Sequence, residues 1–189
     1  KHENLREKYM LDKDEIIISL IGRLEKVKGQ ENMLKIGEIL AKTERGFMIL
    51  LVGEGSERHN LESYARDKNL NVRFLGHINE IDEIYDISDI VVNTSNSEAL
   101  SYTVIEAFAH KKPVVAFNID GIKEVVTDGE DGYLVDFLDY EEFAAKLSTL
   151  MKNEDLRKEF GQRGYEKVKT RFTVEEMVRN IENIYGGML

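Results

Sequence analysis

Short apolar runs alternate with amphipathic stretches along most of the chain. Six of these runs are rich in Val and Ile, and most end at glycine or a small polar residue, which is typical of β-strands. Because their apolar character is nearly continuous, we expect both faces of each strand to be covered. The predicted strands are residues 15–22, 47–53, 72–76, 89–95, 113–117 and 132–137.

The stretches between these strands carry apolar residues at helical spacing, which predicts helices at 30–44, 56–70, 78–88 and 101–111. Strand–helix alternation predicts a doubly wound parallel sheet with right-handed crossovers. From about residue 139 the pattern is only helical, with predicted helices at 139–153, 154–172 and 173–187. We therefore predict one Rossmann-like α/β domain of about six strands, with a core at about 14–138 and a helical tail at about 139–189.

Composition and charge exclude several classes of function. The 189 residues suit one large domain or two very small ones. They carry a formal net charge of -10 with no basic run, so we expect no nucleic-acid partner. The chain has no cysteine, which excludes disulfides, thiolate zinc sites and thiol nucleophiles and fits a reducing compartment. No apolar run reaches the ~20 residues of a membrane-spanning helix, so we expect no transmembrane segment.

The carboxyl ends of the predicted strands are the first place to look for a site, because open parallel sheets bind ligands there. Gly22 allows a sharp turn after the first strand, and Arg23 and Lys28 bracket the loop before the next helix. Two cations beside a helix N-terminus can hold a diphosphate. From this stretch alone, a solvated turn with surface charges is an equally good interpretation.

Other motifs that suggest nucleotide or metal sites are incomplete. Gly53 and Gly55 form a Gly-x-Gly after a strand, but the dinucleotide fingerprint needs a third glycine where this chain has Arg58. Asp12 and Asp14 precede the first strand, so we interpret them as solvated surface acids. Neither motif supports a nicotinamide cofactor or a metal site.

The histidines differ in their expected positions. His77 alone follows a predicted strand at its carboxyl end, where a ligand could reach it. His2, His59 and His110 lie in helical or terminal stretches, and we expect them to be exposed.

Two acidic residues stand out near the fourth predicted strand. Glu98 lies in the loop just before the helix predicted from Ser101, and Glu106 lies two turns inside that helix. At 1.5 Å per residue, eight residues separate them by at most ~12 Å. A carboxylate is a natural acceptor for a sugar diol. In the alternative interpretation, Glu98 caps the helix and Glu106 is an ordinary helix carboxylate.

Several segments together resemble a known family. They occur in a fixed order along nearly the whole chain, and the pair Glu98-x7-Glu106 is the most specific of them. They resemble the C-terminal domain of retaining glycosyltransferases of family 4 (group 1), which have the GT-B fold. The segments are Gly22-Arg23-Leu24 with Lys28-Gly29, LVGEG (51–55), VRFLG (72–76), SEALSYTVIEAFAHKKPVVA (97–116) and DGIKEVVTDGEDGYLV (120–135).

The resemblance implies a nucleotide-sugar donor site, of the UDP or GDP type. By resemblance, Arg23 and Lys28 hold the diphosphate, Glu106 binds the ribose hydroxyls and Glu98 contacts the donor sugar. The catalytic residues it implies are Glu98, Arg23 and Lys28. The donor-binding residues it implies are Gly22, Arg23, Lys28, His77, Ile78, Glu98, Ala99, Leu100, Ser101, Tyr102, Thr103 and Glu106, with His77 and Ile78 bordering the base.

The resemblance also implies a reaction and a larger protein. Sugar is transferred with retention to an acceptor hydroxyl, in polysaccharide or glycoconjugate synthesis, without a metal or another cofactor. The acceptor, a sugar or a lipid-linked glycan, is held by an N-terminal domain that this chain lacks, so we expect the chain alone to be inactive. We expect the protein in the cytoplasm, where the full-length form can lie at the inner face of the membrane.

The chain departs from the family pattern at three positions. Ala99, Lys112 and Asp120 stand where glycine is usual, and they affect the approach to the sugar, the end of a helix and the loop beside the sugar. Two other functions remain open at this level. A sugar-nucleotide epimerase would bind a similar ligand, and a noncatalytic Rossmann module would have the same fold.

Overall fold

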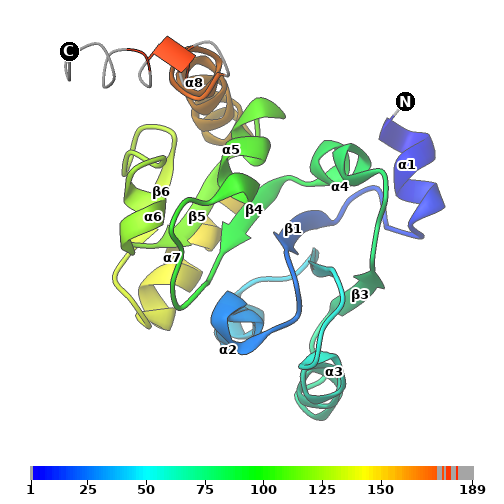
Figure 1. Ribbon diagram of the computed structural model, residues 1–189. Helices are drawn as coiled ribbons and strands as arrows, with labels where there is room; N and C mark the ends of the chain where they lie inside the picture. Colours follow the sequence, from blue (N-terminus) through cyan, green and yellow to red (C-terminus); the bar gives the residue numbers. More distant parts are fainter. Residues whose placement is uncertain (1, 174–175, 177, 180–181, 183–189) are drawn as a thin grey trace.

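The computed structural model of the protein describes residues 2–173, 176, 178–179 and 182. Its centre is a six-stranded sheet in the order β3-β2-β1-β4-β5-β6, with every neighbouring pair parallel (Figure 1). This is the strand order of the Rossmann fold, so the predicted fold class is confirmed. The strands are β1 (Ile16–Ile21), β2 (Phe47–Val52), β3 (Val72–Gly76), β4 (Ile90–Asn93), β5 (Val114–Phe117) and β6 (Gly132–Val135).

The helices also follow the sequence pattern, with ends that differ by a few residues. The prediction does not include α1, α6 or the 3-10 turn η1, and most of the predicted helix at 173–187 lies outside the described residues. The helices are α1 (His2–Lys8), η1 (Lys26–Lys28), α2 (Gln30–Thr43), α3 (Arg58–Asp67), α4 (Ile81–Ile87), α5 (Tyr102–Ala109), α6 (Asp120–Lys123), α7 (Tyr140–Lys152) and α8 (Glu154–Arg171).

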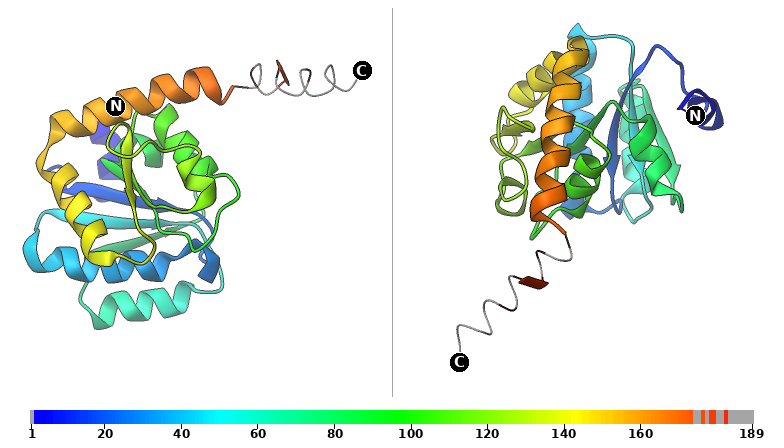
Figure 2. Two further views of the ribbon diagram at one scale, coloured as in Figure 1. Left: turned by 90° about the vertical axis from the view of Figure 1, so that its left-hand side faces the viewer. Right: turned by 90° about the horizontal axis from the view of Figure 1, so that it is seen from above.

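Helices cover both faces of the sheet (Figure 2). In β1, Ile18 and Leu20 belong to the same apolar cluster as the buried side chains of α2, α3 and α7. Ile17 belongs to a cluster on the other face that includes side chains of α4 and residues next to α1. This alternation between two apolar layers explains why β1 reads as a continuous apolar run.

The two described helices of the predicted tail, α7 and α8, pack against the rest of the structure. Asp139 and Asn153 cap them, because their side chains accept hydrogen bonds from the backbone N–H of Glu142 and Leu156. The helix α7 packs against α2, and Phe143 lies fully buried in their shared cluster. The long helix α8 packs against α5 on the opposite face. The tail therefore covers the β5–β6 half of the sheet.

Candidate functional site

The turns that follow β1 and β2 are packed backbone against backbone. Gly53 has a φ of 135°, and a Cβ atom there would lie 2.1 Å from the carbonyl oxygen of Gly22. A Cβ atom on Gly55 would lie 2.2 Å from the carbonyl oxygen of Leu24. No side chain fits at such separations. The two glycines of the Gly-x-Gly motif therefore allow the loops after β1 and β2 to pack together. This packing involves Gly53 and Gly55 and does not require a third glycine at position 58.

Gly29 joins the start of α2 to the loop after β4. Its φ is 65°, and a Cβ atom there would lie 1.9 Å from the carbonyl oxygen of Thr94. The Thr94 hydroxyl donates to the Gly29 carbonyl at 2.8 Å, and the Asn32 amide donates to the Thr94 carbonyl at 3.0 Å. These contacts hold together the two loops that carry Lys28 and Glu98.

Lys28 and Glu98 form an ion pair at the carboxyl edge of the sheet. The Lys28 ammonium lies 2.7 Å from Glu98 Oε1, and the Ser95 hydroxyl donates to the same oxygen at 2.8 Å. Glu98 is the more buried partner, with 10% of its side chain exposed against 30% for Lys28. The second oxygen of Glu98 keeps its capacity to accept hydrogen bonds from a ligand. Glu98 is not a helix cap, because Ser101 is the N-cap residue of α5.

Arg23 lies on the same loop as Lys28 but makes different contacts. Its side chain is 74% exposed, and its guanidinium is 3.0 Å from Glu25 Oε1. The Arg23 carbonyl accepts a hydrogen bond of 2.8 Å from the Gln30 side chain, which fixes the loop backbone. The structure therefore brings Lys28 to Glu98, whereas the Arg23 side chain extends into solvent.

The loop between β4 and α5 is ordered by its own polar side chains. The Asn93 side chain makes two of these contacts. Its Oδ1 accepts a hydrogen bond from the Ser95 backbone N–H at 3.0 Å, and its Nδ2 donates to the Ser101 hydroxyl at 3.0 Å. The Ser101 and Thr103 hydroxyls are 3.1 Å apart. All of these contacts are local, and they set the direction in which the chain enters α5.

The middle of this loop is held by α6. A Cβ atom on Gly121 would lie 2.4 Å from the carbonyl oxygen of Glu98 and 2.6 Å from that of Ala99. Asp120 points outward and pairs with Lys123 at 2.8 Å. The close approach to Glu98 and Ala99 therefore requires glycine at position 121.

The first turn of α5 faces the solvent beside this loop. Tyr102 is 70% exposed, and Leu100 is half-buried. The first hydrogen bond of the helix runs from the Ile105 N–H to the Ser101 carbonyl, at 3.2 Å. The N–H groups before Ile105 have no acceptor inside the helix and carry its positive end. This end can accept an anion next to Lys28.

Glu106 has one buried partner. The Tyr85 hydroxyl donates to Glu106 Oε2 at 2.6 Å and lies 3.4 Å from the Thr103 carbonyl. Tyr85 is fully buried, whereas Glu106 is exposed. Burial, followed by the hydrogen bond to Glu106, raises the pKa of Tyr85 far above its usual value of 10.0. The sequence gives no sign of this contact, because Tyr85 occupies an ordinary apolar position in α4.

The His110 ring packs against the ring of Tyr85. The two rings stack with centroids 5.2 Å apart and an interplanar angle of 21°. The ring nitrogens of His110 lie 3.2 Å from carboxylate oxygens of Asp86 and Asp82. His110 is half-buried, with 24% of its side chain exposed, so the expectation of an exposed residue is wrong. His59 is exposed, as expected.

His77 and Ile78 follow the edge strand β3. His77 is exposed, and Ile78 packs on the apolar cluster that includes Tyr9 and Ile84. Two strands, β2 and β1, lie between β3 and β4. Three strand spacings of about 4.8 Å separate β3 from β4 by about 14 Å. A ligand that contacts both His77 and Glu98 must therefore be elongated.

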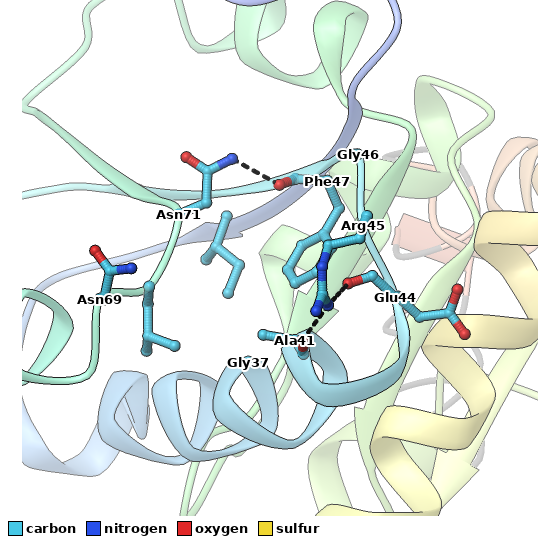
Figure 3. A pocket seen from close by; sticks show the side chains of 10 residues that line it. Gly37, Ala41, Glu44, Arg45, Gly46, Phe47, Asn69 and Asn71 are labelled. Carbon is cyan, nitrogen blue, oxygen red and sulfur yellow. Dashed lines mark hydrogen bonds between the residues drawn. The ribbon is translucent and has the colours of Figure 1, made fainter.

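The larger hollows of the described surface do not include the predicted site residues. A hollow of about 360 Å³ lies at the amino edge of the sheet, between α2 and the loop before β3, and its labelled lining includes Glu44, Arg45 and Asn71 (Figure 3). At the carboxyl edge, a hollow of about 10 Å³ lies between β1 and β4 and includes Lys28 and Glu98. The predicted residues thus line an open surface.

The described residues contain neither a metal-site cluster nor a membrane-spanning helix. Within them, no cluster of three or more His, Cys, Asp or Glu side chains has the arrangement of a metal site. None of the described helices has the length and apolar character needed to cross a membrane.

Comparison with known proteins gives consistent relatives. The family model described as glycosyl transferases group 1 matches residues 1–167. The capsular polysaccharide biosynthesis glycosyltransferase CapM of Staphylococcus aureus is 26% identical over 192 residues, covering 100% of this chain and 50% of CapM. The crystal structure of an S. aureus TarM variant with fondaparinux, α-GlcNAc-glycerol and UDP has a TM-score of 0.87 and 28% identity, covering 91% of this chain and 36% of TarM.

A third match concerns a single domain. The C-terminal domain of LpcC, a glycosyl transferase group 1 family protein from Francisella tularensis, has a TM-score of 0.81 and 27% identity, covering 92% of this chain and 94% of that domain. The chain spans about half the length of curated relatives such as CapM. The family model covers most of the sequence, and the fold agrees with it. The chain belongs to the glycosyl transferases group 1 family.

Proposed function

We propose that this chain is the donor-binding domain of a retaining glycosyltransferase. The observation that carries the proposal is the arrangement around the N-terminus of α5. Lys28 and Glu98 pair on one side of it, and Glu106 is held by Tyr85 one turn further along the helix. A cation, a helix N-terminus and two carboxylates are the groups needed to bind a diphosphate between two polyhydroxylated sugars.

The roles divide along the ligand. Lys28, the N–H groups at the start of α5 and Arg23 hold the diphosphate, and the exposed Arg23 side chain exchanges its contact with Glu25 for the ligand. Glu106 accepts hydrogen bonds from the ribose. Glu98 accepts from the donor sugar, beside the backbone of residues 99–103. His77 and Ile78 border the base, about 14 Å away across the sheet.

The proposed reaction is a front-face transfer of a hexosyl group. The bond between the anomeric carbon and the leaving phosphate oxygen breaks, and the acceptor oxygen bonds to the same face of that carbon. The acceptor proton passes to the leaving phosphate oxygen. Negative charge grows on the leaving diphosphate, and Lys28, Arg23 and the positive end of α5 stabilise it. This scheme uses no metal, and the donor is of the UDP or GDP type.

The rest of the enzyme is part of the proposal. In the full-length protein an N-terminal domain holds the acceptor, a sugar or a lipid-linked glycan of polysaccharide synthesis, in the cytoplasm at the inner face of the membrane. Positioning of the acceptor contributes ~7–11 kcal/mol to such reactions, so this chain alone should transfer sugar poorly. The CapM and TarM relatives, both about half covered or less, support the existence of that second domain.

Calorimetry with UDP, GDP and ADP tests the diphosphate site. Lys28→Ala and Arg23→Ala should each weaken the best ligand by roughly 1.5–3 kcal/mol, the value of a hydrogen bond to a charged group. Lys35→Ala is the control, because Lys35 forms its ion pair with Glu31 within α2 and does not contact Lys28 or Glu98 in the described structure. Unchanged affinity in both Lys28→Ala and Arg23→Ala would refute the site.

A further inference from the structure

The orientation of Glu106 depends on a residue that does not itself reach the surface. Glu106 is exposed, and a carboxylate on the outside of a helix normally samples several rotamers. Here the Tyr85 hydroxyl holds Oε2 at 2.6 Å, the length of a charge-assisted O–H···O⁻ hydrogen bond. This bond favours the rotamer in which Oε2 faces Tyr85 and leaves Oε1 without a hydrogen bond from Tyr85.

Tyr85 can impose this orientation because its own ring cannot move. It is fully buried in the apolar layer between α4 and α5. His110 stacks on one side of the ring and is itself held between Asp82 and Asp86. The phenol therefore presents its hydroxyl to Glu106 from a fixed point.

The hydroxyl also keeps its proton. Burial raises the pKa of Tyr85, and the carboxylate of Glu106 raises it further, so the group remains a donor throughout the neutral range. A carboxylate has about four acceptor positions, and Tyr85 occupies one of them. Both positions on Oε1 and one on Oε2 remain, which is enough for the two hydroxyls of a ribose.

We propose that Tyr85 is a positioning residue for ribose recognition, acting through Glu106 without touching the ligand. The inference rests on the proposed function, in which Glu106 accepts hydrogen bonds from the ribose. This role predicts a selective effect on ligand affinity. Loss of the Tyr85 hydroxyl should weaken ligands that have ribose hydroxyls and should leave ligands without them unaffected.

The test compares UDP with 2′,3′-dideoxyuridine diphosphate on this chain by calorimetry. Tyr85→Phe keeps the ring and its stack and removes only the hydroxyl. It should weaken UDP about three- to tenfold, less than loss of a direct charged contact, and leave the dideoxy compound within about twofold. Tyr64→Phe is the matched control, since it removes a Tyr–Glu hydrogen bond of 3.1 Å to Glu38, between α3 and α2. It should change neither affinity.

A third variant separates the proposed ribose contact of Glu106 from the positioning role of Tyr85. Glu106→Gln should weaken UDP and spare the dideoxy compound. If it does so while Tyr85→Phe binds UDP normally, the positioning role is wrong and the ribose contact stands. If Tyr85→Phe weakens both compounds equally, Tyr85 has only a structural role and the inference is overturned. If Glu106→Gln has no effect, or neither UDP nor GDP binds, the proposed function fails and the inference with it.

Discussion

The two edges of the sheet are built in different ways. At the carboxyl edge, the loops touch through backbone atoms, and a Cβ atom on Gly29 would lie 1.9 Å from the Thr94 carbonyl. At the amino edge, a Cβ atom on Gly46 would have no neighbour within 4 Å. The amino edge has a hollow of about 360 Å³, where Arg45 donates to the carbonyls of Ala41 and Glu44 (Figure 3) and Glu44 pairs with Lys152 of α7.

At the carboxyl edge, side chains of the predicted site come together from separate elements. Lys28, from the turn before α2, meets Glu98, from the loop before α5, 70 positions along the chain. Glu106 meets Tyr85 across α5 and α4. Such contacts depend on tight packing between loops, and the glycines provide it. The following predictions test this difference between the edges.

The largest expected effect is on the free energy of unfolding. It is the difference between Gly29→Ala at the carboxyl edge and Gly46→Ala at the amino edge. Gly29 has φ 65° and Gly46 has φ 68°, so both substitutions carry the same left-handed cost of about 1–2 kcal/mol. Gly29→Ala must in addition displace the loop at Thr94, and it should lower the free energy of unfolding by about 3–5 kcal/mol. Urea denaturation measures both variants. Equal losses would show that the packing of the carboxyl edge is unimportant.

A smaller effect separates the two carboxylates of the carboxyl edge. Glu106→Gln should weaken both UDP and a UDP-sugar by about 1.5–3 kcal/mol, because both ligands have the ribose. Glu98→Gln should weaken only the UDP-sugar, because its partner is the sugar. Calorimetry with each ligand gives the four values.

Arg45→Gln provides the control for this measurement. It changes a charge beside the larger hollow at the amino edge and should leave both ligands unaffected. If both glutamate variants weakened both ligands equally, the separate roles would be wrong. If Arg45→Gln weakened them as much, the hollow at the amino edge would be the binding site.

The smallest effect concerns an ion pair of the amino edge. Lys152 lies 2.5 Å from Glu44 Oε1 and, with the Ser148 hydroxyl, lowers the pKa of Glu44 below its usual value of 4.5. A carboxyl with a lowered pKa in the folded state stabilises the fold above its unfolded pKa, and this contribution is lost as the pH falls through the folded value. Glu44→Gln should therefore cost less than about 1 kcal/mol at pH 7, since Lys152 is largely exposed.

Urea denaturation at several pH values checks this prediction. The difference between wild type and Glu44→Gln should shrink as the pH falls below 4.5, where Glu44 becomes neutral in both states. A difference that stays constant down to pH 2 would contradict it.

The sequence predicts the sheet well because each strand is a short, largely apolar run between turns. It does not predict α6, which is four residues long and exists where Gly121 packs on the backbone of Glu98. It does not predict α1 either, because its seven residues, His2–Lys8, carry few apolar side chains and give no helical periodicity. Elements that depend on a single close approach leave little trace in an apolar pattern.

The candidate site divides in the same way. Position at the end of a strand identifies Lys28 and Glu98, and the order of the strands then brings β1 next to β4 and makes their pairing possible. Position at a strand end and strand order do not reveal the contact of Tyr85 with Glu106, because Tyr85 has the spacing of a core residue. The exposed position expected for His110 is wrong for a related reason, since its stacking partner lies on another helix. The binding roles of these residues stay predictions.

The central place of β1 governs how the sheet is completed while the chain is being synthesised. One side of β1 pairs with β2, and β3 then extends that half, so half of the sheet is available once residue 76 has been made. The other side pairs with β4 at Ile18 and Ser19, and β4 begins only at Ile90. During that interval β1 has an open edge of unpaired backbone groups, which is a template for aggregation. A nascent chain or truncation that stops before β4 would therefore need a chaperone to remain monomeric.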